Sequence, residues 1–193
     1  MAKKITLKKL VPAKEEGVRE KVRKFKLYLV GDRVFSNAQA AFTLFNSSRL
    51  GQELEGKINY SFFETVYLLE RKKANLYFKG KKLSVAKFLE KAYDKDKNFY
   101  TKYAVYRDMK SRGYVIKSAL KFGAEFRVYE KGKSPEEEHA KWILYPVHES
   151  NLLTWHDFAA KNRVAHSTRK NLLIAIVDDE GEVTYYECQW LRP

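Results

Sequence analysis

The chain has 193 residues, which is enough for one ordinary domain or two small ones. Hydrophobic residues make up 45% and aromatic residues 15%, so a packed core is expected and intrinsic disorder is excluded as the first interpretation. Lys and Arg total 38 against 24 Asp and Glu, and the net charge of +14 favours a polyanionic partner such as nucleic acid. The charged surface of a heat-adapted protein would explain the number of charges but not their sign.

Two kinds of structure are excluded by what the sequence lacks. Cys188 is the single cysteine, which excludes an intramolecular disulfide and a multi-cysteine zinc site, and we interpret it as a small apolar strand residue. No apolar run approaches the roughly 18 residues that a membrane span needs, and the Lys-rich N-terminus lacks the apolar core of a signal peptide. We therefore expect a cytoplasmic protein without membrane contact.

The chain begins with a charged segment that is followed by a strand pattern. Residues 1–23 are dominated by Lys, Glu and Arg and are expected to be a mobile arm or an edge strand. The alternation K-F-K-L-Y-L-V over residues 24–30 predicts a strand with one apolar face. Gly31-Asp32 predicts a turn into a second strand over residues 33–35. The apolar face of the first strand consists of Phe25, Leu27 and Leu29.

Helix-start signals follow in the same half. Asn37 is the predicted cap of a short helix over residues 38–45. Ser61 and Glu64 have the spacing of a capping box, and Ser84 is the predicted cap of a third helix. This half is therefore predicted to be a small α+β domain, and we find no cluster in it that suggests chemistry.

The polar run over residues 94–98 is the predicted domain boundary. We divide the chain into an N-terminal α+β domain of residues 1–97 and a C-terminal mixed-sheet α/β domain of residues 98–193. A helix is expected from Phe99, with Gly113 at its C-terminal cap. Further strands are expected over residues 114–117, 124–130, 142–147, 172–177 and 182–190, with another helix from Thr154.

Three side chains of the second half can carry acid–base chemistry. Tyr129 lies near the end of a strand in which Arg127 shares its face. His139 precedes the next strand, and Lys170 lies just before the continuously apolar strand, at a position where α/β sheets often contact ligands. Each has an ordinary structural interpretation as well: a half-buried tyrosine, an incidental histidine and a solvated lysine.

Together these residues suit one kind of reaction. A phenol, an imidazole and an ammonium group, without a carboxylate pair for a metal, suit the cleavage of RNA, whose 2′-hydroxyl is a built-in nucleophile. The phenol needs nearby cations to lower its pKa from about 10, and Lys131, Lys133 and Lys170 are candidates. The four histidines lack metal-ligand spacing, so no metal is predicted. The residues alone favour an RNA-binding protein first and a metal-independent ribonuclease second.

The second half also resembles a known family. The strings FGAEFRVYEKG and RVAHSTRKNLLIAIVDDEGEVTYY closely resemble the catalytic domain of archaeal tRNA-splicing endonucleases, strongly from Tyr103 to Pro193 and more weakly from Gly31 onward. The spacings between Tyr129, His139 and Lys170 resemble those of the family's Tyr, His and Lys triad. Thr168 and Asn171 depart from the pattern, in which an apolar and a basic residue are expected.

The resemblance implies a specific reaction. Tyr129 would be the general base on the 2′-hydroxyl, His139 the general acid on the leaving 5′-oxygen, and Lys170 the stabiliser of the transition state. The substrate would be precursor tRNA with a bulge–helix–bulge element. The products would carry a 2′,3′-cyclic phosphate and a 5′-hydroxyl, formed without metal or other cofactor.

The resemblance also suggests residues for RNA binding and assembly. Arg163 aligns with an arginine that pinches a flipped base, and Trp190 is a candidate second partner because an indole stacks on any base. A core aromatic is an equally good interpretation of Trp190. The acidic tip Asp178-Asp179-Glu180 would plug a basic pocket on a neighbouring subunit, although charge alone predicts an ordinary solvated turn.

Two points on function and assembly stay open between alternatives. A homotetramer is the first expectation, and a heterotetramer with a structural paralogue is the second. A catalytically silent RNA-binding paralogue is the main alternative to an enzyme, and the joint presence of the three triad residues argues against it. A metal-dependent nuclease of the restriction-enzyme type would need an acidic-x-Lys pair, which Glu187-Cys188-Gln189 does not provide.

Overall fold

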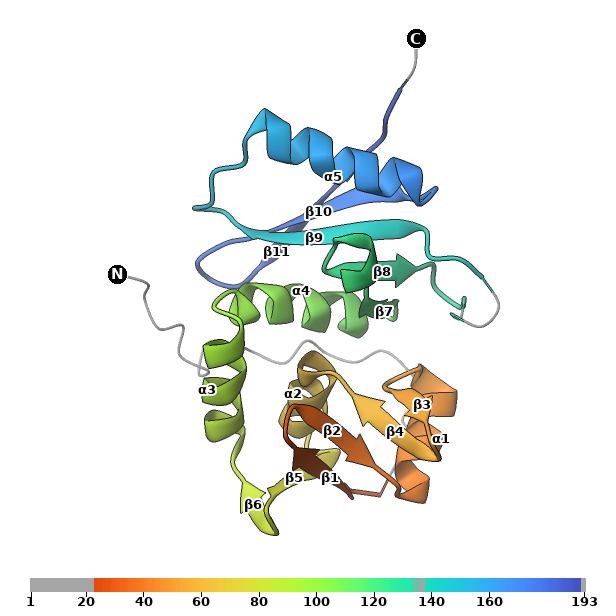
Figure 1. Ribbon diagram of the computed structural model, residues 1–193, viewed down its shortest axis with the longest axis vertical. Coiled ribbons are helices and arrows are strands. Elements are labelled where there is room, and N and C mark those ends of the chain that lie inside the picture. The colour runs from red at the N-terminus through yellow and green to blue at the C-terminus, as the bar shows by residue number, and fades with distance from the viewer. Residues whose placement is uncertain (1–22, 134, 136–137, 192–193) are drawn as a thin grey trace. The chain divides into compact units, whose positions relative to one another are not determined.

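The computed structural model describes residues 23–133, 135 and 138–191. The predicted arm over residues 1–23 therefore lies outside the described residues, apart from Arg23. The chain divides into two compact units, one ending at Phe99 and the other running on from Tyr100. Each unit combines helices with one mixed sheet (Figure 1). The predicted fold class, an N-terminal α+β domain followed by a C-terminal mixed-sheet α/β domain, is confirmed.

The N-terminal unit contains a six-stranded sheet in the order β3-β4-β2-β1-β5-β6. β1 and β5 are parallel, and the other neighbours are antiparallel. The strands are β1 (Phe25–Val30), β2 (Arg33–Ser36), β3 (Gln52–Leu54), β4 (Lys57–Tyr60), β5 (Ala74–Phe78) and β6 (Lys81–Leu83).

The two faces of this sheet have opposite character. Phe25, Leu27 and Leu29 are 5%, 0% and 3% exposed, which confirms the predicted apolar face of β1, while the residues between them are exposed. Three helices belong to the unit, and α2 contacts both β4 and β5. They are α1 (Gln39–Ser48), α2 (Phe62–Glu70) and α3 (Val85–Lys95).

The helix starts were predicted with mixed success. Ser61 and Glu64 form the predicted capping box, and the Ser84 hydroxyl accepts from the amide of Lys87 as a cap should. The prediction that Asn37 caps α1 is wrong, because the cap position is Ala38, which makes no side-chain hydrogen bond to the helix. The hydroxyl of Ser36 accepts from the Ala38 amide instead, at 3.3 Å.

The C-terminal unit is built on a five-stranded sheet in the order β11-β10-β9-β8-β7. β9 and β10 are parallel, and the other neighbours are antiparallel. The elements are α4 (Phe99–Ser111), β7 (Val115–Ser118), the 3₁₀ turn η2 (Leu120–Phe122), β8 (Phe126–Tyr129), β9 (Trp142–His148), α5 (Trp155–Ser167), β10 (Asn171–Val177) and β11 (Val183–Cys188).

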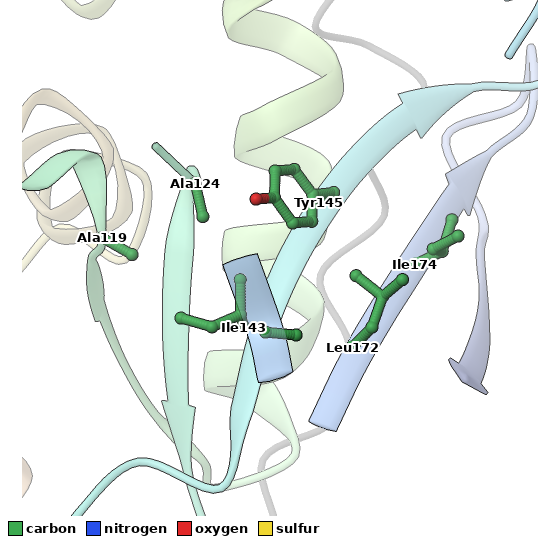
Figure 2. Packing of buried hydrophobic residues seen from close by; sticks show 7 residues of the cluster. Ala119, Ala124, Ile143, Tyr145, Leu172 and Ile174 are labelled. Atoms are coloured by element: carbon green, nitrogen blue, oxygen red, sulfur yellow. The ribbon is translucent and has the colours of Figure 1, made fainter. Parts of the chain in front are cut away.

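Apolar side chains on both faces of this sheet pack against helices. On one face, Ile143 and Tyr145 of β9 and Leu172 and Ile174 of β10 form a buried cluster with Ala165 of α5 (Figure 2). On the other face, α4 lies across the sheet (Figure 1). The rings of Tyr106 in α4 and Phe126 in β8 have centroids 6.2 Å apart. The sheet is therefore fixed from both sides, which limits how far its edges can move.

A polar contact joins α4 to the edge strand β11. The hydroxyl of Tyr185 donates to Oδ2 of Asp108 at 2.8 Å, and Nε of Arg112 donates to the same oxygen at 2.7 Å. Burial, and the nearby negative charge of Asp108, raise the pKa of Tyr185 well above its ordinary range, so the phenol stays a donor at all working pH values.

Candidate active site

The three predicted catalytic residues lie at one end of the C-terminal sheet, in β8 or in the segments that lead into β9 and β10. β8 finishes at this end of the sheet, and the parallel strands β9 and β10 begin there. The pairing continues past the strand ends, since the amide of Lys141 donates to the Val128 carbonyl and the amide of Asn171 donates to the Lys141 carbonyl. Tyr129 is the last residue of β8, His139 lies three residues before β9, and Lys170 immediately precedes β10.

Tyr129 is held by packing and by a cation. The residue keeps only 2% of its surface exposed. The guanidinium carbon of Arg127 lies 5.8 Å from the centre of its ring. Because the two residues are two positions apart in β8, they share the face of the sheet that α5 covers. Arg127 is the cation that sequence reasoning missed here, although the alternation had placed it on the same face as Tyr129.

Two of the lysines expected to act on Tyr129 have other contacts. The ammonium of Lys131 lies 5.1 Å from the ring centre of Tyr114. The ammonium of Lys133 forms an ion pair with Glu138. A positive charge from the strand itself, that of Arg127, lies over the Tyr129 ring.

Lys170 is partly buried, and its ammonium group is held by a hydrogen bond. Its ammonium donates to the carbonyl of Thr168 at 2.7 Å. Partial burial lowers the pKa of Lys170, and the positive charge of Arg127 lowers it further. Arg127 therefore acts electrostatically on two of the three predicted catalytic residues.

The two departures from the family pattern have structural roles. The Thr168 hydroxyl donates to the carbonyls of Val164 and Ala165 and closes the end of α5. The side-chain amide of Asn171 contacts Glu187 on β11. Thr168 lies two residues before Lys170 and Asn171 directly after it, so the chain is fixed on either side of the lysine.

His139 is exposed, in contrast to Tyr129 and Lys170. It lies in the connection between β8 and β9, and Ala140, which follows it, is buried and 5% exposed. An exposed imidazole beside a buried anchor is accessible to a large substrate, as a general acid acting on RNA must be.

A pocket of about 230 Å³ lies beside Lys170. Its walls come from the end of α5, the start of β10 and the end of β11. The residues that line it are Asn162, Ala165, His166, Lys170, Asn171, Leu172, Cys188, Gln189 and Trp190.

Trp190 and Arg163 were predicted to bind a base together; the structure places His166 against Trp190, and Arg163 is not among the residues that line the pocket. The ring centroids of Trp190 and His166 are 4.5 Å apart, in an edge-to-face arrangement at 71°. Trp190 is 57% exposed, which disagrees with its interpretation as a core aromatic. Arg163 is exposed one helical turn before His166 on α5. That spacing of three residues was the signal in the sequence that could have identified His166.

The acidic tip is the turn between β10 and β11, and its three residues differ in role. The carboxylate of Asp178 accepts from the amides of Glu180 and Glu182, so it builds the turn. Asp179 lies 3.4 Å from Nε2 of His148, and its side chain is 79% exposed. Glu180 is also exposed. The exposed carboxylates of the tip are therefore those of Asp179 and Glu180.

Two searches over the described residues gave negative results. Within residues 23–133, 135 and 138–191, there is no group of three or more His, Cys, Asp or Glu side chains that could hold a metal ion. In the same part of the chain, no helix is long and apolar enough to cross a membrane.

Comparisons with known proteins cover both units. Residues 25–89 match the N-terminal domain of the tRNA intron endonucleases, and residues 99–185 match their catalytic C-terminal domain. The tRNA-splicing endonuclease of Thermococcus gammatolerans is 43% identical over 166 residues, which is 86% of this chain and 97% of that protein. The chain belongs to the tRNA-intron endonuclease family. It is thus related to endonucleases of tRNA splicing, as its sequence had indicated.

Two further members of the tRNA-intron endonuclease family give the same picture. The tRNA-splicing endonuclease of Methanothermobacter thermautotrophicus is 36% identical over 85% of this chain and 96% of its own length. That of Nanoarchaeum equitans is 45% identical over 67% of this chain and 87% of its own length. The catalytic-domain match contains Tyr129, His139 and Lys170, and Trp190 lies beyond its end.

Proposed function

We propose that the chain is a catalytic subunit that removes introns from precursor tRNA by metal-independent cleavage at bulge–helix–bulge elements. The observation that carries this proposal is that Tyr129 ends β8, His139 lies three residues before β9 and Lys170 immediately precedes β10, all inside the segment that matches the family's catalytic domain. The net charge of +14 supports an RNA substrate, since neutralising phosphates supplies much of the affinity of RNA-binding proteins.

Each residue has a defined part in the proposed reaction. Tyr129 takes the proton from the 2′-hydroxyl, and the 2′-oxygen then attacks the adjacent phosphorus. His139 gives its proton to the departing 5′-oxygen, and Lys170 stabilises the extra negative charge of the phosphorane between these events. The bond from phosphorus to the 5′-oxygen breaks, which leaves a 2′,3′-cyclic phosphate and a 5′-hydroxyl. The proton count balances, since one proton is taken up and one is released.

The observed environments of the three residues support these parts. Arg127 lies over the Tyr129 ring, and a fixed positive charge beside a phenol favours the phenolate that a base must form. The contact of Lys170 with the Thr168 carbonyl holds its ammonium in place before substrate binds. His139 is the exposed member and can reach the leaving group from the solvent side.

A silent paralogue is the second candidate. Such a subunit would bind RNA or support an active partner without cutting. All three residue types that the reaction needs flank the same end of β8, β9 and β10, and this favours an active enzyme over a silent paralogue. We also propose a homotetramer, with a heterotetramer containing a structural paralogue as the alternative, and a cytoplasmic location.

One experiment tests the reaction and its chemistry together. The purified chain is incubated with a bulge–helix–bulge RNA, with and without excess EDTA, and the product ends are identified by mass spectrometry. We expect equal cleavage in both samples and a cyclic phosphate on the upstream product. Loss of cleavage in EDTA would contradict the metal-independent route, and no cleavage in either sample would favour the silent paralogue.

A second substrate tests the nucleophile. RNA with a 2′-deoxy nucleotide at the scissile position lacks the attacking oxygen and should stay intact, while the same substitution one nucleotide downstream should be cut normally. Cleavage of the first substrate would rule out attack by the RNA's own hydroxyl.

A further inference from the structure

One face of the N-terminal sheet carries a row of aromatic side chains on three neighbouring strands. Phe35 of β2, Tyr28 of β1 and Tyr77 of β5 are direct cross-strand partners. The ring centroid of Tyr28 lies 6.0 Å from that of Phe35 and 6.3 Å from that of Tyr77, and the interplanar angles are 36° and 37°. This is the face opposite the buried side chains of β1, and Tyr28 is 37% exposed on it.

Lysines lie over both ends of this aromatic row. The ammonium of Lys26 is 5.5 Å from the ring centre of Tyr77, and that of Lys57 is 5.0 Å from the ring centre of Phe35. Both lysines are exposed. The strand register places two more exposed cations, Arg33 and Lys82, on the same face. Among the described strand residues that the register puts on this face, none is Asp or Glu.

This composition differs from an ordinary solvated sheet face. Such faces usually carry polar side chains of both charges, whereas here three aromatic rings adjoin cations of one sign. Aromatic cross-strand pairs do stabilise a sheet, but that role does not require lysines over the rings or the exclusion of acids. Flat apolar rings flanked by positive charges match a ligand with flat apolar faces and negative charges.

We propose that this aromatic row is a second RNA-binding surface, on which Phe35, Tyr28 and Tyr77 stack bases of a single-stranded segment while Lys26 and Lys57 contact its phosphates. Sheets of other RNA-binding proteins stack two or three bases on exposed aromatics in the same way. The proposal rests on the proposed function only for the identity of the ligand as RNA. It gives the N-terminal unit a role in substrate binding that is separate from the sheet edge of the C-terminal unit.

A second copy of this chain is the competing occupant, because the acidic tip could meet the lysines. The exposed groups of that tip are the carboxylates of Asp179 and Glu180, which have no flat faces to cover three rings. RNA uses both the rings and the charges, and it therefore accounts for more of the surface.

Affinity measurements on the full chain test the stacking. Fluorescence anisotropy with a labelled ten-nucleotide single-stranded RNA is compared for wild type, Tyr28→Ala and Tyr28→Phe. We expect Tyr28→Ala to weaken binding by about tenfold, whereas Tyr28→Phe, which keeps the ring, stays near wild type. Equal affinity for all three proteins would overturn the proposal. Circular dichroism checks that each variant is folded, and the exposure of Tyr28 makes it a mild site for change.

The salt dependence separates the lysines from the rings. Replacing Lys26 and Lys57 with Ala should reduce the slope of log K against log salt by about 1.4, since each phosphate contact on a single strand contributes about 0.7. Tyr28→Ala should leave the slope unchanged. Lys87→Ala is the matched control, because Lys87 is an exposed lysine on α3, a helix that contacts α2. Because the control removes one lysine, a slope loss of about 0.7 in Lys87→Ala would show a general charge effect and overturn the proposal.

Photocrosslinking locates the RNA directly. RNA carrying 4-thiouridine is irradiated with the full chain, and crosslinked peptides are mapped. We expect crosslinks within β1, β2 or β5, and crosslinks confined to residues 100–191 would overturn the proposal. If Tyr28→Ala changes the mass in light scattering but not the RNA affinity, the face is a subunit interface and the RNA proposal fails. Cleavage is measured apart from these assays, so failure to cut a bulge–helix–bulge RNA would count against the proposed function and not against this surface.

Discussion

The guanidinium carbon of Arg127 lies 5.8 Å from the ring centre of Tyr129, two residues away on the same strand. Nε of Arg127 is buried, and within the described residues no group accepts a hydrogen bond from it. The residue as a whole is half-buried, so its guanidinium is fixed in part by packing. It also lowers the pKa of Lys170. Arg127 is thus placed to influence two of the three proposed catalytic residues.

Arg127→Gln should change the pH dependence of cleavage. In the proposed reaction Lys170 must be protonated to stabilise the transition state, and its pKa lies below the ordinary 10.5 because of burial first and Arg127 second. Removing the Arg127 charge raises that pKa, so the alkaline limb of the rate profile should move to higher pH. Single-turnover rates across the alkaline range, corrected for RNA hydrolysis without enzyme, measure this. Arg127→Lys keeps the charge and should keep the limb in place; an unmoved limb in Arg127→Gln would disconnect Arg127 from Lys170.

His139→Ala should lower the cleavage rate by roughly 10²-fold or more and leave RNA affinity nearly unchanged. The reason is that the leaving 5′-oxygen loses its proton donor, while an exposed imidazole contributes little to the binding of a large polyanion. Single-turnover cleavage and filter binding measure the two effects. His156→Ala, an exposed histidine on α5, is the control and should cut normally. Wild-type turnover by His139→Ala would remove this residue from the mechanism.

Replacing Asp179 and Glu180 with Ala should weaken the proposed assembly without damaging the turn. Asp178 must be retained, because its carboxylate accepts the two backbone amides that shape the hairpin. If the exposed carboxylates enter a basic pocket, the dissociation constant of the assembly should rise by about tenfold or more. Light scattering over a concentration series measures this. Glu182→Ala removes an exposed charge from the base of the same hairpin, and an equal effect there would argue against a specific plug.

Tyr185→Phe should destabilise the C-terminal unit by about 1.5 kcal/mol. The substitution removes the 2.8 Å hydrogen bond to Asp108 and leaves that carboxylate with Arg112 alone. Urea unfolding at neutral pH measures the change in the free energy of unfolding. The matched control is Tyr186→Phe, since Tyr186 is the adjacent strand residue and is 54% exposed. Equal stability of the two variants would mean that the bond to Asp108 contributes nothing.

Local patterns were read correctly where one strong signal decided the structure. The alternation in β1 and the capping boxes at Ser61 and Thr154 involve residues close together in sequence, and all three are present. β3, β4 and β6 were missed because strands of three or four residues are too short to show a period, whereas β2, which is equally short, was located by the Gly31-Asp32 turn before it. The error at Asn37 arose because Ser36, one residue earlier, supplies the competing acceptor.

The sites depended on pairing that no local pattern contains. The aromatic row forms because β1 pairs with β5 across more than 40 residues of chain, and neither Tyr28 nor Tyr77 alone suggested a surface. The influence of Arg127 on Lys170 likewise crosses from β8 to β10. The triad was predicted from family resemblance and spacing. That its members flank the same end of β8, β9 and β10 could be seen only once the strand order was known.

The placement of β9 between an antiparallel and a parallel neighbour has a consequence for how such a protein can evolve. Three separate passages of the chain reach the same margin of the sheet, and side chains alternate between its faces. Shifting β8 by a single residue against β9 would turn the side chain of Tyr129 to the opposite face of the sheet. Insertions within the connections leave that alignment intact, whereas an insertion within a strand disrupts it. Variation among descendants should therefore accumulate between the strands and be rare inside them.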